Sequence, residues 1–280
     1  MGVSMKRILL ASVAALGLAG TASAADLAVK APVVYAPVFT WTGCYLGING
    51  GWIGGNDDYT TQPWGNWLID ATPAERAEVT NSYSTDETAG TAGGQFGCQV
   101  QFGSIVLGGE WDWNWSGLSE DNTFAFATTP HWFDRNEWTH KELSYFTTLR
   151  GRLGFAWDRV LIYATGGVAM AAFDASSRIT FPDAVDVQYD YFAAYHERRI
   201  GWTVGGGLEW AFANNWTAKA EFLYLDFGSF DFQGIESTSP AGFANQTRTW
   251  KTDIDAKEYV ARVGINYLFH TGGAPVVAKY

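Results

Sequence analysis

The stretch IVLGGEWDWNW, residues 105–115, decides the fold of this chain. Its odd positions hold Ile, Leu, Gly and three Trp, and its even positions hold Val, Gly, Glu, Asp and Asn. Successive side chains of a β-strand point to opposite faces, so one face is apolar and aromatic and the other carries charge. A soluble sandwich buries such an apolar face, whereas a transmembrane barrel turns it to lipid and keeps the charges in its lumen.

The same alternation recurs in eight runs of about ten residues, the length typical of transmembrane β-strands. The expected strands lie at 41–52, 90–102, 104–116, 143–157, 160–172, 197–212, 215–228 and 257–269. Short turns are expected at Gly103-Ser104, Asp158-Arg159 and Asn214-Asn215, whose residue types suit hairpins. The other connections, near 53–87, 117–142, 173–196 and 230–254, are long. This alternation predicts an all-β, eight-stranded antiparallel transmembrane barrel with short periplasmic turns and four long extracellular loops.

The start of the chain indicates export. Lys6 and Arg7 precede twelve apolar residues at 8–19, and Ala22-Ser23-Ala24 is a small-x-small cleavage site. These features predict a signal peptide over 1–24, cut between Ala24 and Ala25. A membrane anchor is disfavoured, because a helical span needs about twenty apolar residues. The remaining chain divides into a periplasmic lead-in at 25–40, the barrel at 41–269 and a tail at 270–280.

Charge and motifs narrow the classes of function. The net charge is -11, and loss of Lys6 and Arg7 would make it -13, which argues against nucleic-acid binding. No HExxH, GxSxG, CxxC or phosphate-binding glycine loop occurs, so we expect no enzyme, metal or cofactor. A catalytic site on the barrel rim would have to use His131, His140 or His196 with loop carboxylates.

The inward phase of the expected strands carries charges of both signs. An eight-stranded barrel has a lumen just wide enough for side chains to fill, so we expect a network of ion pairs. The alternative is the lining of a narrow pore, since inward glycines such as Gly97 and Gly207 could leave water-filled space. The expected lumen network comprises Glu110, Asp112, Arg150, Arg152, Glu209, Lys219, Glu221, Glu258 and Arg262.

Aromatic residues gather beside the short turns and again roughly ten residues away. Such rings favour the two membrane interfaces, so we expect two aromatic girdles. The expected members are Trp41, Trp52, Phe102, Trp115, Tyr145, Trp157, Trp202, Trp210, Trp216, Phe227, Tyr259, Tyr267 and Phe269.

Cys44 and Cys98 lie near the turn-side ends of two strands expected to be neighbours, both with outward phase. An exported protein can keep a disulfide, and the cross-strand separation roughly suits one. The length of the first loop leaves the register open, so both a bond and two free thiols remain possible.

The expected loops are acidic and partly aromatic. Asp57-Asp58 and Asp86-Glu87 suggest either a solvated anionic surface, which we favour, or contacts to divalent cations in the lipopolysaccharide layer. The second loop would present an adhesive surface or pack over the barrel mouth. Its aromatic residues are Phe124, Phe126, Trp132, Phe133 and Trp138.

Several short motifs in this order resemble one known family. They are Ala25-Asp26-Leu27, Trp41-Thr42-Gly43-Cys44-Tyr45-Leu46-Gly47, Gly93-Gly94-Gln95-Phe96-Gly97, Gly109-Glu110, Leu149-Arg150-Gly151-Arg152-Leu153-Gly154, Tyr163-Ala164-Thr165-Gly166-Gly167, Arg262-Val263-Gly264-Ile265-Asn266-Tyr267-Leu268-Phe269 and the tail Pro275-Val276-Val277-Ala278-Lys279-Tyr280. Over nearly its whole length the chain resembles the small outer-membrane proteins of alphaproteobacteria, often called outer-membrane immunogenic proteins, with an OmpA-like barrel.

The resemblance implies a surface antigen of a Gram-negative cell envelope that supports envelope integrity and meets host factors. Lipid and lipopolysaccharide would surround it, and Tyr267 and Phe269 resemble the signal read by the barrel-assembly machinery. Some members of the family look like weak porins. We therefore expect a non-enzymatic outer-membrane surface protein. The alternatives are a narrow porin for small hydrophilic solutes and a loop-mediated adhesin or ligand binder.

Overall fold

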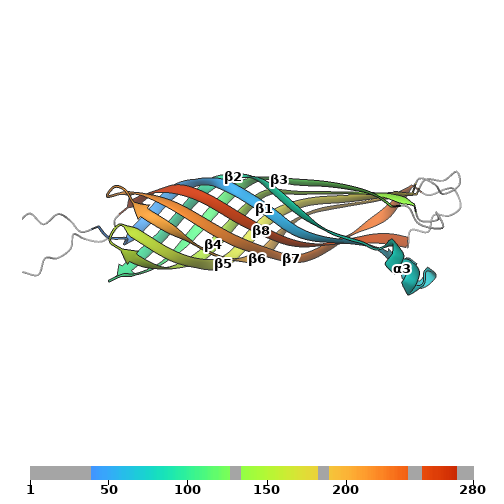
Figure 1. The fold of residues 1–280 in the computed structure, drawn as a ribbon, viewed down its shortest axis with the longest axis horizontal. Helices are drawn as coiled ribbons and strands as arrows, with labels where there is room; N and C mark the ends of the chain where they lie inside the picture. The colour runs from blue at the N-terminus through green and yellow to red at the C-terminus, as the bar shows by residue number, and fades with distance from the viewer. Residues whose placement is uncertain (1–38, 127–133, 182–188, 239–247, 270–280) are drawn as a thin grey trace, which may run out of the picture. The chain divides into compact units, whose positions relative to one another are not determined.

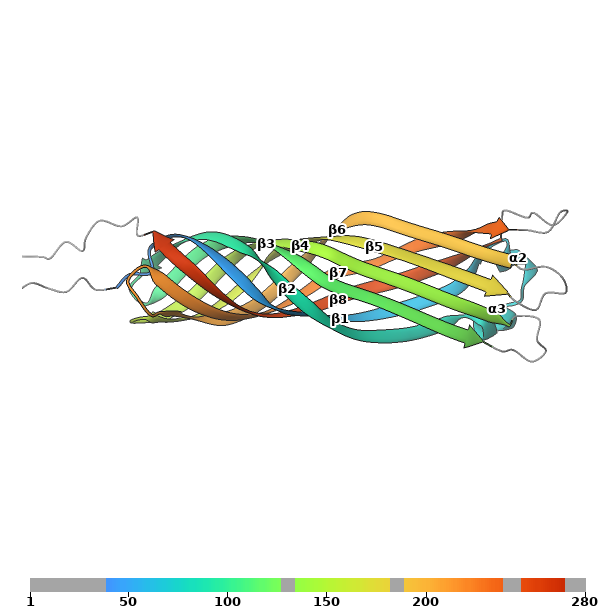
Figure 2. The same ribbon diagram turned by 90° about the horizontal axis from the view of Figure 1, so that it is seen from above.

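The structure, a computed structural model, describes residues 39–126, 134–181, 189–238 and 248–269. Eight antiparallel strands pair in chain order, and β1 pairs with β8 to close the ring (Figures 1 and 2). The strands are β1 (Gly43–Gly65), β2 (Asn81–Phe102), β3 (Ile105–Phe126), β4 (Arg135–Trp157), β5 (Val160–Phe181), β6 (Tyr189–Ala211), β7 (Trp216–Thr238) and β8 (Arg248–Phe269). The predicted eight-stranded antiparallel barrel is confirmed.

Two short helices, α2 (Trp67–Asp70) and α3 (Pro73–Val79), connect β1 to β2. Thr72 caps α3 in a capping box with Glu75, and Pro73 occupies the first helical turn. The hydrogen bonds from Thr72 lower the pKa of the Glu75 carboxyl. Within the described residues, no helix is long and apolar enough to cross a bilayer.

Three short connections mark one end of the barrel, which we call the turn end. They join Phe102 to Ile105, β4 to β5 and β6 to β7. Gly103 and Asp158 adopt positive φ angles of 61° and 51°, which glycine and aspartate tolerate better than most residues. The three turns fall where the sequence predicts them. The opposite end, where α2 and α3 lie in Figure 1, is the loop end.

The expected extent of the loops was wrong. Each strand has 22 or 23 residues, whereas the expected strands have 12 to 16. Most of 53–87, 117–142, 173–196 and 230–254 therefore belongs to strands. The connection from β1 to β2 is reduced to residues 66–80, which contain the two helices. The other three lie almost wholly outside the described residues.

The outward face of the strands changes character about half-way along. In β3 it is apolar at most positions from Ile105 to Trp115, then carries Ser119, Asp121 and Thr123. β8 likewise changes from apolar side chains over 259–269 to acidic and basic ones over 251–257. Each apolar stretch has the length that a tilted strand needs to cross the hydrocarbon core, about 9–11 residues. We call this apolar zone the belt, and the remaining half of each strand the loop-end half.

Two gaps in strand pairing divide the loop-end half into two sheets. β2 and β3 pair only between the turn that joins them and the pair formed by Thr91 and Ser116. Both strands continue beyond this pair towards the loop end. β6 and β7 pair from the turn end up to Trp202 and Asp226. They pair again near Phe192 and Ile235, and the stretch between these two regions is unpaired. These gaps set off two four-stranded sheets, β3-β4-β5-β6 and β7-β8-β1-β2, which β6 and β7 join again near the loop end.

The inner faces of these two sheets carry apolar side chains beside buried polar and charged ones. They enclose a core in which Phe173 packs against Phe227 and Phe230, with ring centroids 5.2 and 5.6 Å apart. Leu118, Leu143, Ile254 and twelve other buried side chains complete this core. The loop-end half therefore resembles a soluble β-sandwich, with polar side chains on its outer faces and an apolar core between its sheets.

Most residues expected in the aromatic girdles project outward from the belt or its edges. They are Trp52, Phe102, Trp115, Tyr145, Trp157, Trp202, Trp210, Trp216, Tyr259, Tyr267 and Phe269. Two predictions were wrong. Trp41 is 0% exposed, because the segment before β1 turns inward and its indole N–H donates to the Asp158 carbonyl (3.1 Å). Phe227 is 2% exposed, because it continues the inward phase of Glu221, Leu223 and Leu225 and packs in the core of the loop-end half.

Candidate functional site: the interior of the barrel

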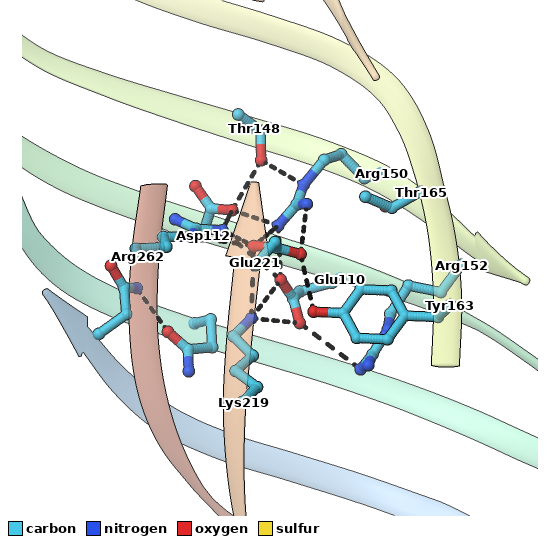
Figure 3. Close-up of polar contacts among 12 residues, drawn as sticks. Glu110, Asp112, Thr148, Arg150, Arg152, Tyr163, Thr165, Lys219, Glu221 and Arg262 are labelled. Carbon is cyan, nitrogen blue, oxygen red and sulfur yellow. Dashed lines mark hydrogen bonds and ion pairs between the residues drawn. The ribbon is translucent and has the colours of Figure 1, made fainter. Parts of the chain in front are cut away.

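Eight charged side chains meet inside the belt, and all of them except Glu209 are labelled in Figure 3. Four are acidic and four are basic, so the network is neutral overall, and every member is at most 5% exposed. The members are Glu110, Asp112, Glu209, Glu221, Arg150, Arg152, Lys219 and Arg262. They come from five strands, so their contacts bridge the lumen as well as neighbouring strands.

Glu110 lies at the centre of the part of the network that is nearer the turn end. Its carboxylate accepts hydrogen bonds from Lys219 Nζ (2.8 and 3.0 Å), Arg150 Nη2 (2.5 Å) and the Tyr45 hydroxyl (2.6 Å). The Arg152 guanidinium lies 3.8 Å from the centroid of the Tyr163 ring and donates to Tyr45 Oη (2.8 Å). A buried carboxylate and a buried guanidinium are thus both paired and hydrogen-bonded, as burial requires.

Arg150 and Arg262 join the other two carboxylates of the centre. Both donate to Asp112 Oδ2 at 2.8 Å, and both contact Glu221, at 2.9 Å for Arg150 Nη1 and 2.7 Å for Arg262 Nη2. Glu209 forms a separate arm, in which it accepts from Arg152 Nη2 (2.6 Å). Hydroxyl and amide side chains hydrogen-bond the remaining oxygens, which ties the network to the wall.

Glu258 does not belong to this network, contrary to the prediction. It contacts Lys141 Nζ (2.8 Å), which also binds Asp57, in a second buried cluster in the loop-end half. Nearby, Glu120 accepts hydrogen bonds from the hydroxyls of Tyr59 and Thr85, both at 2.8 Å. Lys141, Asp57 and Glu120 lie in segments that the sequence predicts to be loops, so strand phase does not predict their inward orientation. Asp57 is thus an inward, paired residue and not part of a solvated loop.

At the inward glycines Gly97 and Gly207, a neighbouring tyrosine side chain fills the space that a larger residue would need, so these glycines leave no open space. A Cβ atom at Gly97 would lie 2.4 Å from the Tyr45 ring, and one at Gly207 would lie 2.7 Å from the Tyr163 hydroxyl oxygen. Neither tyrosine is among the residues that the sequence predicts for the site. The glycine–tyrosine pairing across strands is the sequence signal that would have located them.

Apolar layers lie on both sides of the charged network. Towards the turn end, Trp41 packs with Val106, Ala156 and Leu161. Towards the loop end, the core of the two sheets follows, and beyond it Arg135 lies over the rings of Phe126 (4.3 Å) and Trp250 (5.1 Å).

The structure joins Cys44 and Cys98 by a disulfide between β1 and β2. The two residues are directly opposite each other in the strand register, near the turn end. The bond closes a ring that includes the whole connection between these strands. It therefore fixes the pairing that the sequence left open.

Two of the predicted rim histidines lie on the outer wall of the loop-end half. His140 Nδ1 is 3.0 Å from Asp121 Oδ1, and His196 Nδ1 is 2.6 Å from Asp174 Oδ1. Phe124, Phe126 and Trp138 lie in strands and not in a loop. His131, Trp132 and Phe133 fall outside the described residues, as does the signal-cleavage site at Ala24 and Ala25.

A closed antiparallel barrel with an apolar, aromatic-edged outer belt and charges inside defines an integral outer-membrane β-barrel protein. A family model, the outer membrane protein beta-barrel domain, matches residues 11–269. The chain belongs to this family, and the predicted resemblance is confirmed. It is located in the outer membrane, so lipid and lipopolysaccharide surround it.

Two relatives extend the comparison. The 31 kDa outer-membrane immunogenic protein of Brucella melitensis is 34% identical over 281 residues, covering 95% of this chain and 100% of that protein. The 25 kDa outer-membrane immunogenic protein of the same organism is 25% identical over 275 residues, covering 95% and 99%. The solved structure of the outer membrane protease OmpT from Escherichia coli covers 84% of this chain and 99% of its own, at 9% identity and a TM-score of 0.45.

Proposed function

We propose that this protein is a non-enzymatic structural element of the outer membrane whose barrel does not conduct. Its role is to support envelope integrity and to carry a stiff β-wall beyond the membrane for contact with a host or the environment. The observation that carries the proposal is the filled interior. The charged network within the belt is neutral and buried, and apolar layers lie on either side of it.

Charge balance argues against the narrow-porin alternative. A pore for hydrophilic solutes keeps water beside its lining charges, whereas here Glu110, Arg150 and Lys219 satisfy one another at hydrogen-bond distance. Opening a path would separate these pairs and leave charges with no partner in a narrow lumen, at a cost of several kcal/mol. The names of the relatives also support a surface role without catalysis, since both are called outer-membrane immunogenic proteins.

The same proposal includes an orientation and a route of biogenesis. Export by residues 1–24, cleavage between Ala24 and Ala25, and insertion by the barrel-assembly machinery would place the turn end in the periplasm and the loop end outside. The loop-end half, with its charged outer wall, would then face the surroundings of the cell.

Planar-bilayer recording of the refolded chain from Ala25 onward tests the proposal. Heat-modifiable gel mobility establishes that each preparation is folded. Folded protein without current steps is the expected result. Discrete steps that change in Arg150→Gln but not in Asp121→Asn, a substitution on the outer wall, would establish the porin reading and overturn ours.

A further inference from the structure

Two aromatic rings, one exposed and one half-buried, lie on the outer wall of the loop-end half. Trp138 in β4 and Phe192 in β6 point outward among polar neighbours such as Asn136, Ser176 and His196. Phe192 is 45% exposed although it lies beyond the apolar belt, where lipid does not cover it. Water-facing aromatic rings that cluster on a polar wall indicate a contact surface.

The two rings flank Arg178, which lies on the strand between them and forms an ion pair with Asp190 of β6. Trp138 is directly opposite Arg178 in the register of β4 and β5, and Arg178 is directly opposite Phe192 in that of β5 and β6. Residues paired in this way have Cβ atoms about 4.5–5.5 Å apart, so the three side chains form one row across three strands. Arg178 donates two hydrogen bonds to the Asp190 carboxylate, from Nε to Oδ1 at 3.0 Å and from Nη2 to Oδ2 at 2.5 Å.

These four side chains line a hollow of about 600 Å³. This volume lies within the range of about 300–1,000 Å³ found for small-molecule sites. The Trp138 ring is also supported from behind, because it stacks nearly parallel on His140 (5.9 Å between centroids, 5° between planes), which in turn contacts Asp121. The hollow therefore has a fixed aromatic side and a fixed polar floor.

We infer that this hollow, which we call the wall platform (Trp138, Arg178, Asp190 and Phe192), binds a saccharide. A sugar ring has an apolar C–H face, which an aromatic ring can cover, and an equator of hydroxyl groups. A guanidinium paired with a carboxylate offers such hydroxyls both donors and acceptors in a planar arrangement. Saccharides are also the ligands most abundant just outside the lipid of an outer membrane.

The charges of the platform disfavour other ligand classes. A phosphate or sulfate would meet Asp190 beside Arg178, whose charge is already neutralised. A purely apolar ligand would have to cover an ion pair without replacing its water contacts, which costs free energy. The inference extends the proposed surface role, and its failure would leave the non-conducting barrel untouched, because the two are measured separately.

Binding of oligosaccharides to the refolded chain in phosphatidylcholine nanodiscs tests the inference. The probes are polysaccharide released from lipopolysaccharide by removal of lipid A and a printed array of mammalian glycans. Binding to the first identifies the ligand as the cell's own envelope sugar, and binding to the second identifies it as a host glycan. Either result supports a saccharide site if it depends on the wall platform.

The dependence is measured with Trp138→Ala and Phe192→Ala, and with Trp64→Ala as the matched control. Trp64 is an outward tryptophan in the loop-end half that lies near a cation, Lys251 (5.0 Å), but on β1, in the other sheet. We expect affinity to fall at least tenfold in the first two variants and to stay unchanged in the control. All preparations must show heat-modifiable mobility. Absence of binding to both sets of probes, or equal binding by all four proteins, would overturn the inference.

Discussion

Arg150 in β4 reaches across the lumen to Glu221 in β7, with Nη1 2.9 Å from Oε1 and Nη2 3.4 Å from Oε2. The two strands are not neighbours in the ring, so this contact braces opposite sides of the barrel. Arg150 also donates hydrogen bonds to Glu110 and Asp112, so three carboxylates of the network share this one guanidinium.

Replacement of Arg150 by alanine should therefore destabilise the barrel sharply. Three carboxylates would keep their burial but lose a shared partner, a change that costs about 3–5 kcal/mol. The expected result is a lower urea midpoint for unfolding in lipid vesicles, followed by tryptophan fluorescence. Arg178→Ala removes an arginine from an exposed ion pair and should change the midpoint little. Equal midpoints for the two variants would show that the network contributes nothing to stability.

Gly97→Ala should also destabilise the protein, because the added methyl group would occupy the place of the Tyr45 ring. Overpacking of a filled interior typically costs about 1–3 kcal/mol. Gly94→Ala is the matched control on the same strand, since its Cβ would point outward and lie 3.5 Å from the nearest atom, the Gly47 carbonyl oxygen. A comparison of urea midpoints tests this, and a loss of stability in both variants alike would contradict the steric explanation.

The sequence predicted the belt well, because there the apolar face meets lipid over an unbroken alternation. The strands of the loop-end half were not predicted, because there the apolar face points inward and the polar face outward, the reverse of the belt. In β7, Phe222 points to lipid within the belt, but Phe230 and Phe232 point into the core beyond it. The reversal coincides with irregularities in strand register, such as the one beside Gly228. When a transmembrane strand is expected, the apolar-outward alternation breaks at this point, so the segment beyond it resembles a loop.

The same reasoning explains what was predicted of the site. Glu110, Arg150 and Arg262 lie in regular alternation within the belt, so their inward orientation followed from the phase alone. Which side chains they contact depends on strand tilt and stagger, which the phase does not contain. Lys141 and Asp57 lie beyond the point of reversal, so their pairing required the structure.

The irregularity beside Phe227 gives a third prediction. Gly228 has a φ of +68°, a left-handed conformation that costs other residues about 1–2 kcal/mol. Gly228→Ala should therefore lower the free energy of unfolding by about that amount, although its Cβ would meet no neighbouring atom within 4 Å. Ser229→Ala, at an exposed outward position next to it, should leave stability unchanged. A neutral Gly228→Ala would mean that the strand can pass this point without the left-handed residue.

The disulfide gives a fourth prediction. Mass spectrometry after alkylation without reductant should find no label on Cys44 or Cys98, and both should be labelled after reduction of the unfolded chain. The double variant Cys44→Ser/Cys98→Ser should unfold at lower urea concentration, since a cross-link of this kind typically contributes about 2–4 kcal/mol. Two labelled thiols in the unreduced protein would refute the bond.

The position of the belt gives the last prediction. Trp111 and Asp121 both point outward from β3, but Trp111 lies within the belt and Asp121 lies beyond it. In a background without the native cysteines, Asp121→Cys should react rapidly with a membrane-impermeant maleimide in lipid vesicles, whereas Trp111→Cys should react only after unfolding. The contrast follows because lipid excludes a charged reagent from the apolar face. If both positions react at the same rate in folded protein, the bilayer covers less of the barrel than the apolar belt indicates. If neither reacts, the loop-end half is covered as well, and the wall platform would not be open to a soluble saccharide.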